Sequence, residues 1–114
     1  MPVITEFVVG ITLADNIDGA PEKTEFNVGD HFYYGFRASD SIGDWKRMVH
    51  TFTHGDKAYD KSWDFEDKFL GAATIGSNAG YNLGSPGVYE MTWYIVDLAG
   101  NKSNVITRTI TVNP

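Results

Sequence analysis

The amino-acid sequence predicts an all-β domain, an antiparallel β-sandwich of about seven strands. Apolar and polar side chains alternate with a period of two in several segments, which is typical of half-buried strands. Gly, Asp, Asn and Ser residues that favour turns separate these segments at short intervals. No stretch of helical periodicity is long enough for the crossover that parallel strands need, so the sheets are expected to be antiparallel.

The pattern is clearest in residues 87–112, where large apolar side chains alternate with polar ones on both sides of a turn. The apolar positions are Tyr89, Met91, Trp93, Ile95, Ile106, Ile110 and Val112. Asp97 can hold its own backbone in the turn, and Gly100 supplies the positive φ of a tight return. The segment predicts a β-hairpin with Trp93 in the core. Arg108 shares the apolar face, so its stem is expected to lie along apolar surface while its guanidinium reaches a carboxylate or solvent. The alternative is a bulge near Thr107 that reverses the alternation.

The other strands are expected at residues 3–13, 32–38, 47–53, 58–69 and 72–75. Gly10 marks a possible bulge in the first of them. The segment 58–69 alternates poorly and fits either one strand or a short helix. Residues 15–25 and the turn at 27–30 connect the first two strands. The uncharged, glycine-rich residues between 76 and 87 are expected to form a long loop.

Length and charge exclude several classes of protein. The 114 residues make one domain, residues 1–114, and three Trp, six Tyr and seven Phe supply its core. The absence of Cys removes disulfides, thiol catalysis and thiolate metal sites. A net charge of −6 with scattered Lys and Arg argues against nucleic acid and anionic membranes as partners. No segment has the about 20 apolar residues of a membrane-spanning helix.

The hairpin resembles a known family. Gly-Val-Tyr at 87–89, Asp-Leu-Ala-Gly-Asn at 97–101 and Thr-Arg-Thr-Ile-Thr-Val at 107–112 are similar to the closing strands of bacterial immunoglobulin-like domains. The segment Asp-Asn-Ile-Asp-Gly at 15–19 resembles one near the start of such modules. The resemblance implies an immunoglobulin-like fold of seven strands in a surface or secreted protein, and it names no ligand. In this fold, Tyr89 stands where a tyrosine corner is expected.

The sequence offers little support for an enzyme. Gly-Ser-Asn-Ala-Gly at 76–80 does not have the glycine spacing of a nucleophile elbow. His31, His50 and His54 are interpreted as surface or rim residues, and His50 and His54 on one strand lie too far apart for one metal ion. The expected function is non-catalytic.

Calcium is the possible cofactor. The loop with Asp40 and Asp44 and the hairpin turn with Asp97 and Asn101 are expected at the same end of the sandwich, where their oxygens could surround Ca²⁺. No Asp-x-Asp pair falls within either loop, which weakens the case. The alternative is that these residues only form Asx-turns.

Carbohydrate binding is the alternative function. Trp45, Tyr59, Trp63 and Tyr81 fall in or near expected loops, where an aromatic ring could stack on a sugar. The competing interpretation is that these rings cover the ends of the core.

The sequence therefore predicts a spacer or adhesion module. The positions of the two chain ends test this prediction. The expected partners are neighbouring domains of the same chain, and a polysaccharide or a cell-surface protein of a host. A location outside the bacterial cell follows from the resemblance, and a short cytoplasmic protein remains the alternative. The first and last strands should start and end at opposite poles, some tens of ångströms apart.

Overall fold

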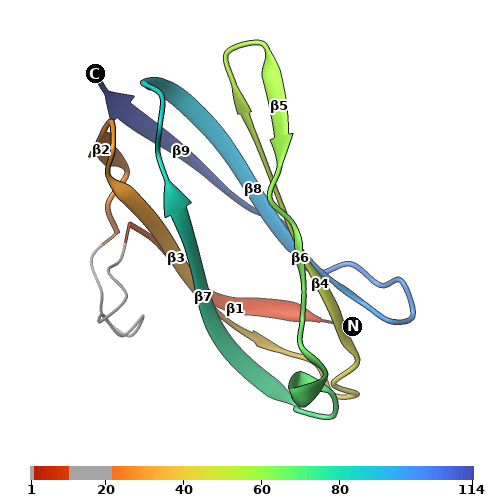
Figure 1. Cartoon of the computed structure of the whole chain (residues 1–114). Coiled ribbons are helices and arrows are strands. Elements are labelled where there is room, and N and C mark those ends of the chain that lie inside the picture. The colour runs from red at the N-terminus through yellow and green to blue at the C-terminus, as the bar shows by residue number, and fades with distance from the viewer. Residues whose placement is uncertain (1, 11–21) are drawn as a thin grey trace.

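The computed structural model describes residues 2–10 and 22–114 (Figure 1). Within these residues the chain forms nine strands and one 3-10 turn. The elements are β1 (Val3–Val9), β2 (Glu25–Asn27), β3 (His31–Ser39), β4 (Trp45–His54), β5 (Lys57–Asp60), β6 (Trp63–Asp64), η1 (Asp67–Phe69), β7 (Thr74–Asn82), β8 (Gly87–Asp97) and β9 (Ile106–Asn113). The expected end of the first strand at 11–13 and the segment 15–19 lie outside the described residues.

Two sheets enclose one hydrophobic core. The smaller sheet has the strand order β1-β3-β7, and the larger has the order β2-β9-β8-β4-β5, with β6 pairing with β4 beyond the end of β5. All pairs are antiparallel except β2 and β9, which are parallel. The buried side chains of both sheets form one cluster. The prediction of an all-β sandwich is confirmed, with this one parallel pair added.

The centre of the core is Trp93 on β8, which is completely buried as predicted. Its ring lies 4.6 Å from Phe7, 5.3 Å from Tyr34 and 4.4 Å from His50, measured between ring centroids. These rings come from β1, β3 and β4, so Trp93 joins both sheets. Edge and stacked contacts of this kind add to the free energy gained from burying the rings.

The loop predicted at 76–87 is wrong over most of its length, because residues 74–82 form strand β7. Each residue of β7 pairs with one residue of β3, from Ser39 opposite Thr74 to His31 opposite Asn82. Gly80 allows this pairing, because a Cβ there would lie 2.3 Å from a ring carbon of Tyr33. A strand with little alternation of its own is therefore formed by close pairing with its neighbour.

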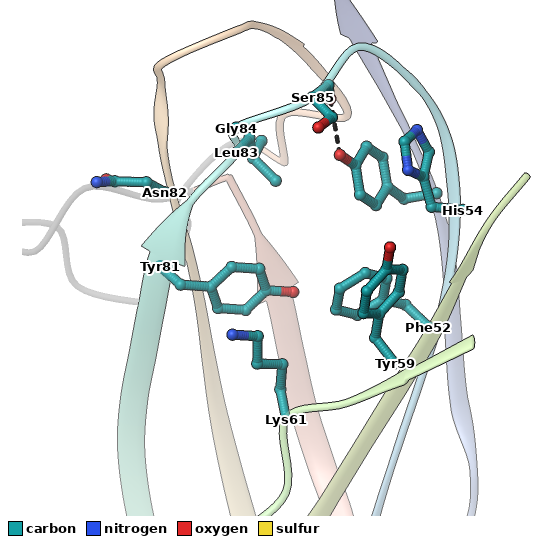
Figure 2. A pocket seen from close by; sticks show the side chains of 10 residues that line it. Phe52, His54, Tyr59, Lys61, Tyr81, Asn82, Leu83, Gly84 and Ser85 are labelled. Atoms are coloured by element: carbon teal, nitrogen blue, oxygen red, sulfur yellow. Dashed lines mark hydrogen bonds between the residues drawn. The ribbon is translucent and has the colours of Figure 1, made fainter. Parts of the chain in front are cut away.

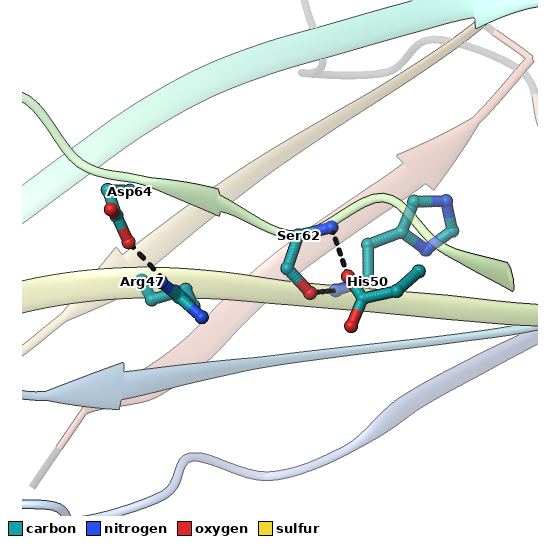
Figure 3. Close-up of polar contacts among 5 residues, drawn as sticks. Arg47, His50, Ser62 and Asp64 are labelled. Atoms are coloured by element: carbon teal, nitrogen blue, oxygen red, sulfur yellow. Dashed lines mark hydrogen bonds and ion pairs between the residues drawn. The ribbon is translucent and has the colours of Figure 1, made fainter.

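The segment 58–69 is neither one strand nor a helix but β5, β6 and η1 in succession. Between β5 and β6 the Ser62 hydroxyl accepts a hydrogen bond from the His50 amide at 3.1 Å, and the Ser62 amide donates to Asp60 at 2.8 Å (Figure 3). Arg47 donates from Nε to Asp64 on β6 at 2.8 Å. At the break the Lys61 amide still donates to the His50 carbonyl at 2.7 Å, and the side-chain bonds supply partners for the His50 and Ser62 amides.

The final hairpin follows its predicted register. The pairing of β8 with β9 has no irregularity from Gly87 opposite Val112 to Trp93 opposite Ile106. Arg108 extends past the Phe7 ring, 5.7 Å from its centroid, and its Nε donates to Glu22 at 2.9 Å. The expectation for Arg108 is confirmed without a bulge.

The described ends of the chain lie at opposite poles (Figure 1). Near the start of β1, the Ile4 amide donates to Asn104 Oδ1 at 2.8 Å, and Asn104 Nδ2 donates to the Ile4 carbonyl at 3.1 Å. Asn104 stands just before β9, and the eight residues of β9 then rise about 25 Å toward the other pole. This arrangement agrees with the prediction that the first strand starts and the last strand ends at opposite poles.

Replacing Trp93 with Ala should cost about 3–5 kcal/mol of unfolding free energy, because the void would touch both sheets. Urea denaturation measures this loss. Val88→Ala on the same strand is the matched control, since Val88 is 52% exposed and should change stability by under about 1 kcal/mol. A loss under about 1 kcal/mol for Trp93→Ala would contradict the central place of this ring.

Candidate functional sites at the two ends of the sandwich

Three carboxylates meet at the pole where β3 and β8 end and β4 begins. Each of Asp40, Asp44 and Asp97 offers one oxygen, and these oxygens all lie within 4.8 Å of one another. Asp40 and Asp97 are 2% and 1% exposed, and Asp44 is half-buried. The two loops were expected to bring these three residues together, and they do.

Two of these carboxylates also shape the loops that carry them. Asp40 Oδ1 accepts a hydrogen bond from the Ile42 amide at 3.0 Å, and Asp97 Oδ1 accepts one from the Asn101 amide at 2.7 Å. The Asn101 side chain donates to Asp97 Oδ2 at 3.0 Å. Asn101 therefore orients Asp97 through its backbone amide and Nδ2, and its predicted role as a ligand stays a prediction. The structure therefore contains both the Asx-type hydrogen bonds and the acidic cluster.

Hydrogen bonds from Asn101 favour the charged form of Asp97. Burial raises the pKa of Asp97, but the hydrogen bonds from the side chain and amide of Asn101 outweigh burial, so the net pKa lies below its ordinary value. Asp44 Oδ1 is buried and accepts no hydrogen bond within the described structure. Carboxylates this close repel one another, so the arrangement favours a bound cation with oxygen ligands.

A pocket of about 210 Å³ lies at the opposite pole, between the end of β7 and the hairpin of β4 and β5 (Figure 2). Its walls come from three parts of the chain. The residues that line it are Phe52, His54, Tyr59, Lys61, Tyr81, Asn82, Leu83, Gly84, Ser85 and Tyr89. Figure 2 shows Tyr81 pointing across the pocket from one sheet toward Tyr59 and Phe52 of the other.

Aromatic rings form most of this pocket. The Phe52 centroid lies 5.1 Å from Tyr59, 6.1 Å from Tyr81 and 5.6 Å from Tyr89. Tyr89 donates from its hydroxyl to the Ser85 carbonyl at 2.7 Å, four residues earlier. This bond is the tyrosine corner that the sequence predicted. It fixes the connection between β7 and β8 against the mouth of the pocket.

Only two of the four aromatic residues predicted to bind sugar meet here, namely Tyr59 and Tyr81. All four lie in strands, not in loops. Trp45 is 2% exposed and donates from Nε1 to the Ala72 carbonyl at 2.8 Å, so it cannot stack on a ligand. Trp63 is half-buried in the core between the sheets and donates from Nε1 to the Tyr34 hydroxyl at 2.7 Å. Both tryptophans cover the core, which was the competing interpretation.

His50 was predicted to lie at the surface or rim, and this is wrong because its side chain is completely buried. Its ring stacks on Trp93, with an angle of 7° between the two planes. Nδ1 lies 3.1 Å from the Thr92 carbonyl, and Nε2 lies 2.8 Å from the Tyr81 hydroxyl. Burial lowers the pKa of His50 to about 4, so the ring is neutral at pH 7. Burial also raises the pKa of Tyr81.

The sequence analysis missed Phe52, Lys61 and Tyr89 as pocket residues. Tyr89 was predicted on the apolar face of the hairpin, and Phe52 falls in the strand expected at 47–53. Both residues line the end of the core. The available signal for Lys61 was its place after the Tyr59-Asp60 pair, where the strand pattern stops. Nothing in the sequence places this lysine opposite Tyr81, because β5 and β7 belong to different sheets.

Comparison with known proteins shows the fold. No protein-family model matches the sequence, and no curated protein does. A T24K superoxide reductase (neelaredoxin) from Ignicoccus hospitalis superposes with a TM-score of 0.58 at 12% identity, covering 97% of this chain and 82% of the other. A Niemann-Pick type C2 protein from Japanese carpenter ant gives 0.58 at 7% identity, covering 98% and 92%.

The chain folds as an immunoglobulin-like β-sandwich. At such low identity the likeness to a reductase and to a Niemann-Pick type C2 protein concerns the backbone fold alone. Among the described residues, no helix is long and apolar enough to cross a membrane.

Proposed function

We propose that the domain is a non-catalytic module of a bacterial surface or secreted protein, where it acts as a spacer or adhesion segment. The observation that supports this role is the position of the chain ends at opposite poles. A module with this arrangement adds its length to a tandem chain, and its neighbours in that chain are its first partners. The location outside the cell rests on the resemblance of residues 87–112 to bacterial immunoglobulin-like modules.

The strand contacts suit a load-transmitting role. The Asn104 side chain holds the start of β1 through two hydrogen bonds, and the end of β9 is paired on both sides, with β8 and β2. The longest dimension is 44 Å, against 31 and 20 Å for the others. Both ends are therefore tied into sheets along an elongated body.

Calcium binding by Asp40, Asp44 and Asp97 is part of this proposal. The acidic cluster lies at the pole where β1 begins, so a bound Ca²⁺ would stiffen the loops nearest the preceding module. Asn101 would act as a positioning residue through its two hydrogen bonds to Asp97. Backbone carbonyls and water would complete the six to eight oxygens that Ca²⁺ prefers.

The spacer role predicts the shape of two copies joined by a short flexible linker. Small-angle X-ray scattering should show a maximum dimension greater than that of one copy by about its 44 Å long axis. The single domain is the control. An increase limited to the 20–31 Å of the shorter dimensions would mean side-by-side packing and would contradict the spacer role.

Calcium should raise the melting temperature, because a ligand that binds only the folded state stabilises it. The gain is about 2.7 kcal/mol when free Ca²⁺ is about 100 times its dissociation constant. Calorimetry in calcium and in chelator, at equal ionic strength, measures the shift.

Asp44→Asn should abolish this shift, while the exposed Asp56→Asn in the turn between β4 and β5 should keep it. Asp44 is the better variant because Asp40 and Asp97 also cap their own loops. Equal melting curves in calcium and in chelator would leave only the turn-forming role of these residues.

Carbohydrate binding is the second candidate function. One observation favours it, namely that Tyr59 and Tyr81 line the same pocket although they lie on different sheets. A polysaccharide or a glycosylated surface protein would then be the partner of an adhesion segment. Because Trp45 and Trp63 cover the core, the candidate sugar site is restricted to this one pocket.

A further inference from the structure

The pocket at the β5 end of the sandwich is small and built mainly of aromatic rings. Its volume of about 210 Å³ lies below the about 300–1,000 Å³ of pockets that enclose drug-sized ligands. One ring-sized group fits, such as one sugar residue of a longer chain. Tyr59 is 40% exposed, so part of its ring is free to contact a ligand.

The lining of the pocket carries one fixed charge, and it is positive. Lys61 Nζ lies 5.3 Å from the centroid of the Tyr81 ring. No carboxylate belongs to the lining. Lys61 forms no ion pair within the described structure, and the same holds for Lys23, Lys46, Lys57 and Lys102, but among these five Lys61 alone belongs to the pocket lining. The neighbouring Asp60 instead accepts a hydrogen bond from the Ser62 amide.

This charge stands out in a chain whose net charge is −6. An ammonium group held over an aromatic face at a small pocket favours a ligand with a negative group within its reach. A neutral sugar would leave the ammonium without an anionic partner. A sugar carboxylate would give it one, while the apolar C–H face of the sugar ring contacts tyrosine.

We propose that the pocket formed by Tyr59, Tyr81 and Lys61 binds a sugar ring that carries a carboxylate, the chemical class of the uronic acids. Tyr59 and Tyr81 contact the ring, and Lys61 binds the carboxylate through its three N–H donors. Figure 2 shows the Lys61 ammonium on the pocket side of the hairpin and Asn82 turned away from the pocket. The inference rests on the second candidate function and names its substrate class.

The test compares two methyl glycosides that differ only at C6. Titration of the ¹⁵N-labelled domain with methyl β-glucuronide should shift the amides of residues 59–61 and 81–85 saturably. The dissociation constant of the glucuronide should be about tenfold lower than that of methyl β-glucoside, since a charge-assisted hydrogen bond contributes about 1.5 kcal/mol or more. Benzoate, an aromatic carboxylate, is the third probe and should bind more weakly than the glucuronide.

Variants assign the preference to one side chain. Lys61→Gln should remove the tenfold preference by weakening the glucuronide to about the affinity of the glucoside. Lys57→Gln is the matched control, because Lys57 belongs to the same hairpin and lies outside the pocket lining. Tyr59→Ala should weaken both glycosides, and unchanged amide shifts around Trp93 establish that each variant folds.

Each other outcome overturns the inference in a different way. Equal affinities for both glycosides, unaffected by Lys61→Gln, would overturn the acidic class and keep carbohydrate binding. Tighter binding of benzoate than of the glucuronide would assign the pocket to another class of ligand. The absence of any saturable shift would overturn both the inference and the second candidate function, while the spacer role has its own test.

Discussion

The structure depends on one buried polar contact, the imidazole of His50 between the two sheets. Its Nδ1 lies 3.1 Å from the Thr92 carbonyl on β8, and its Nε2 lies 2.8 Å from the Tyr81 hydroxyl on β7. The ring also stacks on Trp93 at 4.4 Å. Because the Thr92 carbonyl can only accept, Nδ1 carries the proton, and Nε2 accepts from Tyr81. This bond connects the large sheet to the edge of the small one and fixes the tyrosine that forms the pocket wall.

The long central strands then determine where the candidate sites lie. β4 and β8 run antiparallel along the domain from the acidic cluster to the aromatic pocket. Asp97 ends β8, and Asp44 directly precedes β4. Tyr89 lies near the start of β8, and Phe52 lies near the end of β4. The acidic cluster beside the start of β1 and the aromatic pocket at the opposite pole thus lie at the two ends of one β4–β8 ladder.

The sequence predicted what local chemistry determines. Strands β3, β4, β8 and β9 were predicted because one face of each is buried and the other faces solvent. The acidic cluster was predicted because Asp40 and Asp97 stand where two strands end at the same pole. The rest depends on distant partners. Strand β7 has little pattern and forms by pairing with β3, and β2 forms by parallel pairing with β9. His50 has a polar side chain on an apolar face, and its burial depends on partners distant in the sequence, the Tyr81 hydroxyl 31 residues away and the Thr92 carbonyl 42 residues away.

The most direct test of this account is the protonation state of His50, measured by ¹⁵N NMR of the labelled imidazole at pH 6. The structure predicts a neutral ring, since burial lowers its pKa to about 4, with the proton on Nδ1 and a hydrogen-bonded Nε2 without one. In Tyr81→Phe the Nε2 signal should lose the effect of that hydrogen bond. A charged imidazolium at pH 6, or a proton on Nε2 of a neutral ring, would contradict the arrangement in which Nδ1 donates to the Thr92 carbonyl and Nε2 accepts from Tyr81.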